Sequence, residues 1–543
     1  MMKKHLLQVL LCTGLLLCLL TVPALAADWT YDPDAKTLSG DILYPIQNVT
    51  ADENRRLTIG PYDYVNFQGP LDLTGTITGT DGETYTLVAI ADEAFDHRHD
   101  IKSLTLPATI ESIGKSAFLV CYNLFTVDLS RCTQLTTIPE SAFQACQHLE
   151  TVILPTTLTS IGPYAFYYCH ALSSVNLSEC TRLESLEAYA FGGAPFTSLD
   201  LPDSITTLGE GAFVGCTSLT AVDLSVYPNL TDISSAFRNC KSLTSIKMPD
   251  DITSLAPKAF QDCISLPSLD LSGYRNLTSI GDYAFSRCSS LTTLVPPSGL
   301  THIGEYAFSG CTALTTLDLS GCTGFTTIGE YAFAKSCLTS IQLPTTLTSL
   351  DKWAFSQCNS LTSLDLSACT QLTSIGAYAF QYFNSLTSVK LPASLTSIED
   401  SAFRACPALT EVILFSAVPP TLSSSAFLAS PDNIRIIVPS GSVDAYKTAE
   451  NWKSRANYIE PMGCGLAGLS ASGGSVSVNV VLADAPACLL VTRYDGERMT
   501  DSYLCSVSSS GKITASLSGS GSTYKAFLLS SDTYVPLCRQ AAI

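Results

Sequence analysis

The sequence predicts a mainly β protein whose central part is a right-handed solenoid of about 14 coils. The first observation is a period. An Ala-Phe pair recurs fifteen times between Phe95 and Phe427, at intervals of 22 to 25 residues, most of them 23–25. The second observation is that the same apolar pattern returns within every interval. A period of this size is typical of a solenoid, in which each coil buries its apolar face only against its neighbours.

One coil shows the pattern in full. Its first stretch, Leu-Thr-Ser-Leu-Asp-Leu-Ser-Ala-Cys, runs from Leu361 to Cys369, and Tyr-Ala-Phe closes the coil at Phe380. The stretch matches the L-x-x-L-x-L-x-x-C strand of a leucine-rich repeat, which lines one face of the coil. Successive side chains of a strand point to opposite faces, so Asp365, which lies between two leucines, is expected to point away from the core.

Two kinds of coil alternate along the solenoid. The shorter kind carries Leu-Pro after its strand, as at Pro107 and Pro344, and the longer kind carries Asp-Leu-Ser, as at Asp270 and Asp318. Proline donates no ladder hydrogen bond, so the strand of the shorter coil is expected to end there. The structural unit is therefore predicted to be a pair of coils.

The two ends of the chain predict three further segments. Residues 1–26 are predicted to be a secretory signal peptide, with Lys3 and Lys4 before an apolar run and small residues before a cleavage point after Ala26. Residues 27–94 are predicted to form a β-rich N-terminal cap, and residues 95–460 the solenoid with a C-terminal cap. Residues 461–543 alternate apolar and polar side chains between Gly/Ser turns, which predicts a small β-sandwich-like module.

The predicted location is outside the cell, either secreted or at the cell surface. The signal peptide indicates export, and no later segment is apolar for long enough to span a bilayer. The mature chain would keep 27 basic and 48 acidic residues, a formal net charge of −21. A surface of this charge repels phosphate backbones and anionic lipids, so we expect neither nucleic acid nor a membrane surface as a partner.

The repeats carry blocks of the form Ile-Gly-x-x-Ala-Phe-x-x-Cys, such as the one from Ile303 to Cys311. Through these blocks the chain resembles the BspA-like leucine-rich repeat family of bacterial secreted and cell-surface proteins. The segment from Val438 to Trp452 looks like the C-terminal cap of that family, and the resemblance covers roughly Tyr85 to Glu460. It implies a leucine-rich-repeat fold and a protein that attaches to host or microbial macromolecules.

The chain contains 21 cysteines, of which two lie in the predicted signal peptide. Eleven follow an Ala-Phe pair and four follow the strand of a longer coil. The other four, Cys464, Cys488, Cys505 and Cys538, lie in the C-terminal module, and the sequence does not show whether any of them form disulfides. Cysteines after the strand recur in every second coil, roughly 10 Å apart, which is beyond the ~7 Å limit for a disulfide. Cysteines after an Ala-Phe pair are close enough, but parallel stacking aims their side chains alike. Buried free thiols that act as small apolar side chains are therefore expected in the solenoid.

No pattern of a catalytic, cofactor or metal site is present in the sequence. It lacks a nucleophile elbow, a phosphate-binding glycine loop, a calcium loop and a pair of carboxylates set apart from the repeats. The run from Asp96 to Asp100 contains His97 and His99, and histidine is a common metal ligand in proteins. The place of this run after the first Ala-Phe pair favours a solvated surface corner instead. We expect no enzyme, no cofactor and no metal ion.

The outward residues of the strands form the candidate ligand-binding face. The residue two positions before the outward carboxylate or amide is almost always Ser or Thr, and together these side chains form a polar stripe. The candidate site residues are Asp128, Asn176, Asp200, Asp223, Asp270, Asp318 and Asp365. A solubilising surface would carry the same residues, so the stripe by itself does not establish a binding role.

We expect a monomeric, non-catalytic protein that binds an extracellular protein or glycan through this face, in adhesion. One alternative is a structural spacer that presents the C-terminal module. Another is an accessory polysaccharide-binding protein, if the tyrosines before the Ala-Phe pairs, such as Tyr306, Tyr331 and Tyr378, are exposed as a row instead of packing at coil corners.

Overall fold

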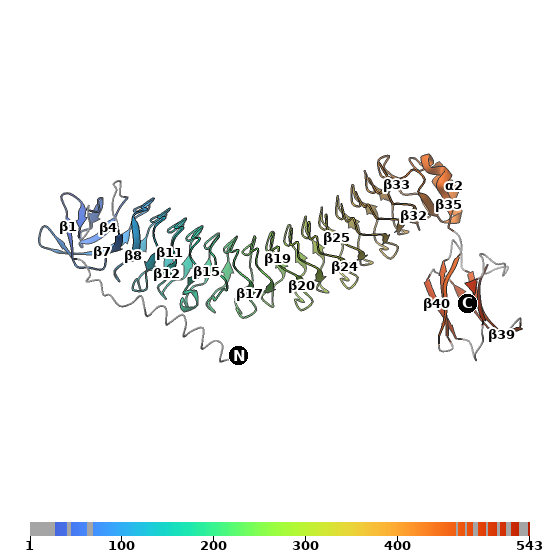
Figure 1. Cartoon of the computed structure of the whole chain (residues 1–543), viewed down its shortest axis with the longest axis horizontal. Helices are drawn as coiled ribbons and strands as arrows, with labels where there is room; N and C mark the ends of the chain where they lie inside the picture. Colours follow the sequence, from blue (N-terminus) through green and yellow to red (C-terminus); the bar gives the residue numbers. More distant parts are fainter. Residues whose placement is uncertain are drawn as a thin grey trace. The chain divides into compact units, whose positions relative to one another are not determined.

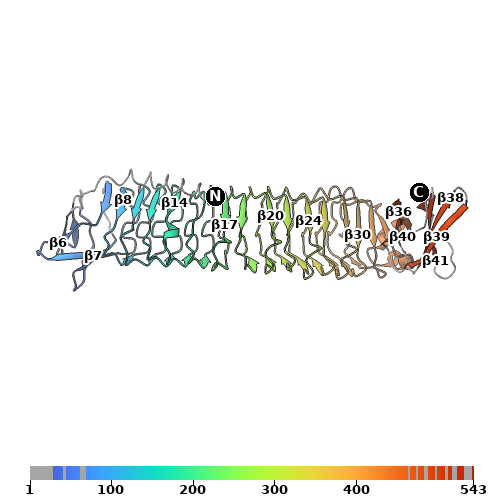
Figure 2. The ribbon, with the colours of Figure 1, turned by 90° about the horizontal axis from the view of Figure 1, so that it is seen from below.

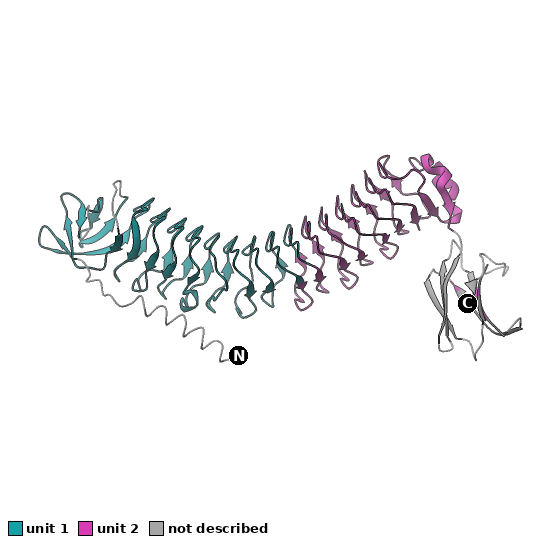
Figure 3. Cartoon of the chain, viewed as in Figure 1, with its two compact units in different colours: residues 1–268, 280–291 teal, residues 269–279, 292–543 magenta. Residues whose placement is uncertain are grey.

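The computed structural model describes residues 28–40, 45–61 and 69–462, together with the strands of the C-terminal region given below. The predicted signal peptide, residues 1–26, lies outside the described residues. The chain divides into two compact units (Figure 3). Unit 1 holds the residues up to 268 and residues 280–291, and unit 2 holds residues 269–279 and those from 292 onward.

Within each unit the coils stack on one another, and most coils carry two short strands (Figure 1). The first strand of a coil lies in the Leu-x-Leu segment, as predicted, and we call the stack of these strands the first strand column. The second strand of a coil is a Ser/Thr-Ile/Leu pair before the Ala-Phe pair, and these strands form the second strand column. Pairing is parallel and in register, as between Val127 of β10 and Val152 of β12.

The first strand column of unit 1 consists of β5 (Gly69–Asp72), β8 (Ile101–Thr105), β10 (Thr126–Asp128), β12 (Thr151–Ile153), β14 (Ser174–Val175), β17 (Ala221–Asp223) and β18 (Ser245–Lys247). The second strand column of unit 1 consists of β4 (Arg56–Ile59), β7 (Thr84–Ile90), β9 (Ser112–Ile113), β11 (Thr137–Ile138), β13 (Ser160–Ile161), β15 (Ser185–Leu186), β16 (Thr207–Leu208) and β19 (Ser254–Leu255). A short 3-10 helix, η1, covers Leu177–Glu179.

The first strand column of unit 2 consists of β20 (Ser268–Asp270), β22 (Thr293–Val295), β24 (Thr316–Asp318), β26 (Ser340–Gln342), β28 (Ser363–Asp365), β30 (Ser388–Leu391), β32 (Glu411–Leu414), β34 (Arg435–Val438) and β35 (Ile459–Pro461). The second strand column consists of β23 (His302–Ile303), β25 (Thr327–Ile328), β27 (Ser349–Leu350), β29 (Ser374–Ile375), β31 (Ser397–Ile398) and β33 (Thr421–Leu422). The strands β20 and β21 (Ser279–Ile280) span the division between the units, because Ser268 and Ile280 belong to unit 1. Figure 2 shows β24 and β30 in the first strand column, where β26 and β28 lie between them.

The core of each unit is a stack of phenylalanines, one from every Ala-Phe pair. In unit 1 the rings stack from Phe95 to Phe285, with centroids 5.1 to 6.0 Å apart. In unit 2 they stack from Phe308 to Phe427, with centroids 5.3 to 5.8 Å apart. The backbone beside them is also bonded from coil to coil, since the N–H of Phe118 donates to the carbonyl of Ala142 (2.8 Å). The repeated Phe therefore fixes the position of each coil on the next.

Each Ala-Phe pair lies between two residues with left-handed backbone. The residue two positions before the Phe and the residue two positions after it have positive φ in nearly every described coil. Many of these are not glycine, such as Val120 (φ 59°) and Trp353 (φ 55°). A left-handed conformation costs such a residue roughly 1–2 kcal/mol, so the stacking of the coils has to offset that cost many times over.

The solenoid has about 16 turns, two more than the predicted 14. The prediction counted the fourteen intervals between the fifteen Ala-Phe pairs, and so left out turns at the ends of the stack. At the N-terminal end β5 pairs with β8 and β7 pairs with β9, so the region before residue 95 already contributes to both strand columns. The remaining strands of that region are β1 (Trp29–Asp32), β2 (Thr37–Ser39), β3 (Val49–Ala51) and β6 (Ile77–Gly79).

After β34 the chain folds over the last turns of unit 2. The 3-10 helix η2 (Ser440–Ser442), the helix α2 (Val443–Thr448) and the 3-10 helix η3 (Lys453–Tyr458) follow one another there. Tyr446 and Trp452 are fully buried, and their side chains donate to the carbonyls of Ser416 (2.9 Å) and Pro420 (2.8 Å). Both aromatic residues therefore close the apolar end of the stack.

The C-terminal region contains two antiparallel sheets. One is formed by β36 (Gly465–Ser472), β37 (Ser475–Val481) and β40 (Gly511–Ser516). The other is formed by β38 (Ala487–Asp495), β39 (Arg498–Val507), β41 (Thr523–Ser530) and β42 (Ala541–Ala542). The assignment of a β-sandwich-like module to residues 461–543 stays a prediction, and Cys464 and Cys538 lie outside the described residues.

Candidate functional site

The structure places most of the candidate site residues at the ends of first-column strands. Exposed aspartates end four of these strands, at Asp223, Asp270, Asp318 and Asp365. The half-buried Asp128 ends β10 in the same way. Asn176 follows the last residue of β14, and Asp200 is exposed but lies outside any strand.

Each strand-end aspartate closes the turn that follows its strand. Asp318 Oδ1 accepts hydrogen bonds from the backbone N–H (2.9 Å) and the hydroxyl (2.6 Å) of Ser320. Asp270 and Asp365 bind Ser272 and Ser367 in the same way. An Asp that bonds to the backbone two residues later is a known turn element, so the Asp-Leu-Ser motif itself predicts this role, which the sequence analysis missed. The second carboxylate oxygen, Oδ2, takes no part in the turn.

Hydrogen bonds lower the pKa of Asp223, Asp270 and Asp365 because they stabilise the charged form. The pKa of Asp270 is lowered by the Ser272 hydroxyl and then by the Ser272 N–H. Burial alone would raise the pKa of Asp365, but the bonds from Ser367 and from Lys390 Nζ (2.9 Å) lower it overall. The carboxylates therefore stay charged across the physiological range of pH.

Asn176 and Asp200 do not continue this arrangement. The amide of Asn176 faces the preceding coil, where it accepts from Leu154 N–H (2.8 Å) and donates to Leu154 O (3.2 Å). In the coil of Asp200, the N–H of Leu201 donates to the hydroxyl of Tyr227 (2.9 Å). The polar stripe of unit 1 is therefore interrupted in these two coils, although the sequence pattern runs through them.

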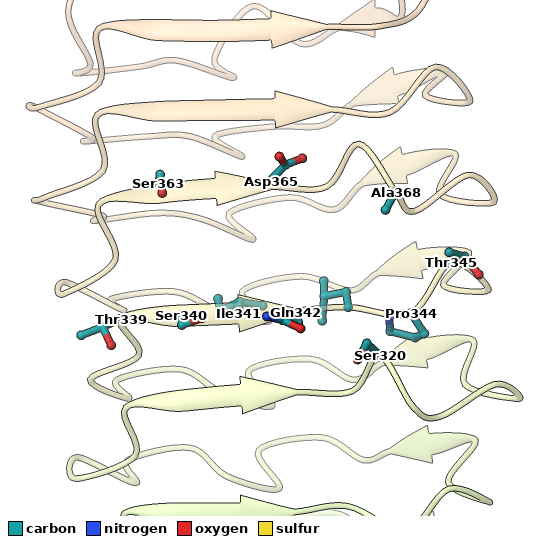
Figure 4. Close-up of a pocket in the computed structure, with 11 residues that line it drawn as sticks. Ser320, Thr339, Ser340, Ile341, Gln342, Pro344, Thr345, Ser363, Asp365 and Ala368 are labelled. Carbon is teal, nitrogen blue, oxygen red and sulfur yellow. The ribbon is translucent and has the colours of Figure 1, made fainter. Parts of the chain in front are cut away.

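Unit 2 has a recess of about 480 Å³ in its first strand column (Figure 4). It lies between β26 and β28, which are not hydrogen-bonded to each other, although β26 pairs with β24 and β28 with β30. Figure 4 shows Ser340 and Gln342 on β26, and Ser363 and Asp365 on β28. The turns that carry Ser320 and Ala368 belong to the longer coils on either side, and both line the recess.

The recess coincides with an irregular coil. Leu338 follows Phe333 by five positions, whereas Leu314 follows Phe308 by six, so the coil that carries β26 is one residue short at this point. A parallel ladder needs matched coils to keep its strands in hydrogen-bonding distance. The ladder is also open between β18 and β20 and between β22 and β24, so the missing residue is not by itself the cause of the opening at β26 and β28.

Chemically, the recess offers hydroxyl, amide and carboxylate groups and the polar backbone of two strand edges. Such groups bind an extended polar chain through many modest hydrogen bonds. No group of three or more His, Cys, Asp or Glu side chains able to hold a metal ion occurs among the described residues. In the same part of the chain, no helix is both long and apolar enough to cross a membrane.

The prediction of free thiols in the solenoid is confirmed for all fifteen cysteines, and fourteen of them are buried. Most of the buried thiols have a further role, because they donate to a carbonyl of the preceding coil. Cys216 Sγ lies 3.5 Å from Phe191 O, and Cys263 Sγ lies 3.3 Å from Phe237 O. Burial raises the pKa of Cys216 to about 12, so its thiolate is almost absent at neutral pH.

The burial predicted for Cys337 is wrong, because this side chain is exposed. In the short coil Ser336 takes the ladder position three residues after Phe333, and Cys337 is displaced by one residue. Ser336 is 1% exposed, and its hydroxyl donates to Phe333 O (2.7 Å).

The tyrosines before the Ala-Phe pairs do form a row in unit 2. The rings of Tyr306, Tyr331, Trp353 and Tyr378 stack with centroids 4.5 to 4.9 Å apart and planes within 16°. All four side chains are half-buried. Because the rings cover each other's faces, the row offers mainly ring edges to a ligand, which does not favour polysaccharide stacking there.

The run from Asp96 to Asp100 forms an exposed corner. His97 Nδ1 lies 2.6 Å from Asp96 Oδ1, and the His99 ring stacks on Tyr122.

Comparison with known proteins gives a family but no curated relative. The family model described as "BspA type Leucine rich repeat region (6 copies)" matches residues 88–220, 136–267, 184–315 and 318–435. A search of curated proteins found no match.

Among solved structures, a leucine-rich repeat protein from Bacteroides ovatus is 24% identical, covers 68% of this chain and 94% of its own, and has a TM-score of 0.45. A leucine-rich cell surface protein from Faecalibacterium prausnitzii is 21% identical, with 70% and 93% covered and a TM-score of 0.38. The pneumococcal vaccine antigen PcpA is 20% identical, with 79% and 96% covered and a TM-score of 0.44.

Proposed function

Because the chain belongs to the BspA-type leucine-rich repeat family, we propose that it is a secreted or cell-surface bacterial protein that binds an extracellular protein or glycan, in adhesion. It acts as a monomer and catalyses no reaction. The candidate strand face is the binding surface, and the recess between β26 and β28 is its centre.

The open ladder at the recess is the observation that supports this proposal. Several neighbouring strands of the first strand column are not hydrogen-bonded to each other, β18 and β20 as well as β22 and β24 among them, whereas between β28 and β30 the backbone groups satisfy each other. At β26 and β28 they face a polar hollow, and unpaired backbone groups gain most from a partner that supplies matching donors and acceptors. The outward Ser340, Gln342 and Ser363 add contacts along the same line.

The charge of the face favours a neutral or basic partner. Asp318 lies in register with Gln342, and Asp365 lies in register with Lys390, which neutralises part of its charge. With a formal net charge of −19 for the whole chain, acidic partners are repelled at long range.

The test is a binding screen of the full mature chain against extracellular-matrix proteins, mucins and glycans at two salt concentrations. Ser340→Trp fills the recess, and we expect it to weaken capture at least tenfold, or about 1.4 kcal/mol. A partner attracted by the carboxylates should also bind less tightly at the higher salt concentration.

The matched control is Ser349→Trp, which places the same side chain on β27 in the second strand column. It should leave capture unchanged, and both variants should melt at the wild-type temperature. If Ser340→Trp folds and still captures the partner with full affinity, the recess is not the binding site. The spacer alternative, in which the C-terminal module binds, would then take its place.

A further inference from the structure

Four of the six histidines of the chain lie on one edge of unit 1, in the turns after the first four Ala-Phe pairs. They are His97, His99, His148 and His170, and all four are exposed. The same turns carry three exposed aromatic side chains, Tyr122, Phe125 and Tyr168, with exposed fractions of 38%, 37% and 45%. We call these seven residues the histidine–aromatic edge.

The rings of this edge hold one another in position. His99 stacks on Tyr122 with ring centroids 4.6 Å apart and planes 11° apart. His148 lies 5.9 Å from Phe125, and His170 lies 5.4 Å from Tyr168, between ring centroids. Ordered and exposed aromatic side chains lose little entropy when they bind, which is why Tyr dominates so many binding surfaces.

Two of the imidazoles have a fixed tautomer. His148 Nδ1 lies 2.7 Å from the carbonyl oxygen of Tyr122, and His170 Nδ1 lies 3.1 Å from that of Gly193. A carbonyl oxygen only accepts, so Nδ1 carries the proton in both neutral rings and Nε2 is left as an acceptor. The edge therefore presents hydrogen-bond acceptors beside exposed aromatic rings.

We propose that the histidine–aromatic edge binds a neutral glycan. The apolar C–H face of a hexose ring packs on an exposed aromatic ring, and a hydroxyl of the same sugar donates to the Nε2 of the adjacent imidazole. Few other ligands combine an apolar face with a rim of hydroxyl donors, and this combination matches a Tyr–His or Phe–His neighbourhood.

The net charge of the chain and the distance between its exposed tyrosines restrict the class of glycan further. The acidic chain repels anionic sugars at long range, and Asp96 already pairs with His97, so the favoured glycan carries no charge. Tyr122 and Tyr168 belong to coils two steps apart, which corresponds to about 10 Å along the stack. An oligosaccharide chain that runs along the coils can therefore contact both. This surface lies in unit 1 and does not depend on the recess of unit 2.

The experiment begins with the full mature chain on an array of neutral and acidic oligosaccharides. Affinity electrophoresis in gels that contain the retained polysaccharide then gives the strength of binding. We expect retention on a neutral glycan, and a loss of at least about tenfold for both Tyr122→Ala and Tyr168→Ala. Alanine is compatible with the backbone of Tyr168 (φ 63°), because Ala145 has the same place in the preceding coil with a φ of 58°.

Tyr382→Ala is the matched control. Tyr382 lies two positions after its Phe, as Tyr168 does, with a φ of 60° and 41% exposure, but it is in unit 2 and outside the histidine–aromatic edge. It should bind as the wild type does, and so should Ser340→Trp, which separates this proposal from the proposed function. The proposal is overturned if no glycan is retained, if only acidic glycans are, or if Tyr382→Ala weakens binding as much as Tyr168→Ala. Capture of a glycoprotein that survives its deglycosylation would show a protein ligand instead.

Discussion

In the strand-end aspartates of the first strand column, one carboxylate oxygen holds the following turn and the other takes no part in it. In Asp318, Oδ1 holds the following turn through Ser320, while Oδ2 takes no part in that turn. The local structure therefore requires an acceptor at this position but not a charge. Asn176 has a different role, because its amide bonds to the backbone of the preceding coil and not to the turn that follows.

The pH dependence of stability follows from these turns. The folded-state pKa values of Asp223, Asp270 and Asp365 lie below the ordinary value, so their stabilising contribution is present above that value and is lost as the pH falls through the folded-state pKa. We expect the melting temperature to fall below about pH 4. The triple variant with Asn at these three positions keeps the turn acceptors and should lose less stability on acidification. Parallel melting curves for both proteins across that pH range would contradict the assignment.

Thiol reactivity gives a second prediction at the level of residues. Burial raises the pKa of Cys216 and Cys358 to about 12, whereas Cys337 is exposed. Among the fifteen solenoid cysteines we expect only Cys337 to be alkylated rapidly in the native protein, and all fifteen after denaturation. Peptide mapping by mass spectrometry distinguishes the sites, and Cys337→Ser should abolish the rapid reaction within the solenoid. Rapid native labelling of Cys216 would mean that the coil stack opens at that position.

At the level of the coil, the left-handed residues on either side of most Ala-Phe pairs carry a conformational cost. They turn the backbone sharply and place the Phe inside the stack, but most of them carry side chains that disfavour positive φ. The coil is therefore held by its neighbours and not by its own backbone preference. A single coil in isolation should not keep this shape.

Glycine substitution tests this interpretation directly. Ala145 has a φ of 58°, so Ala145→Gly should stabilise the protein by roughly 1 kcal/mol. The control is Ala221→Gly in the strand β17, where glycine should instead cost roughly 0.5–1 kcal/mol. Urea unfolding monitored by circular dichroism measures both changes. A loss of stability in both variants would show that left-handed strain is not the controlling factor.

The individual coils also show which features the sequence can predict and which it cannot. The Ala-Phe period and the Leu-x-Leu alternation were sufficient for the solenoid, its first strand column and the buried thiols, because a repeated pattern averages out local exceptions. They were insufficient where one coil departs from the others. The exposure of Cys337 arises from a single missing residue before Leu338, which the repeated pattern does not reveal. The recess was missed because the pattern does not show where neighbouring strands fail to pair, whereas the turn role of Asp318 could be predicted from Asp-Leu-Ser.

For the whole molecule, the ends of the stack matter most. Every internal coil covers the apolar face of its neighbours, but the final one depends on α2 and the residues around it. Arg455 adds to this cover, since its guanidinium lies 5.0 Å from the centroid of the Phe427 ring, the last phenylalanine of the core. Without such a cover, apolar surface and strand edges are open to other molecules.

Removal of the buried indole should expose this dependence. Trp452 is fully buried, so Trp452→Ala should cost about 3–5 kcal/mol and promote self-association of the open end. Trp353→Ala is the control, because that ring is only half-buried in the aromatic row and should cost clearly less. Urea unfolding measures the loss of stability, and light scattering measures the association. Equal costs for the two variants would show that the C-terminal cover is dispensable.

The alternation of long and short coils also constrains how this protein can evolve. Near-identical repeats in a gene recombine unequally, which adds or deletes whole copies. Phe118 and Phe166 are 48 residues apart, one long and one short coil, so deletion of such a pair brings like coils into the places of like coils. Deletion of a single coil would instead set two long coils, with their protruding turns, against each other. Viable descendants should therefore differ in length by even numbers of coils, and the number of binding positions along the face would change in the same steps.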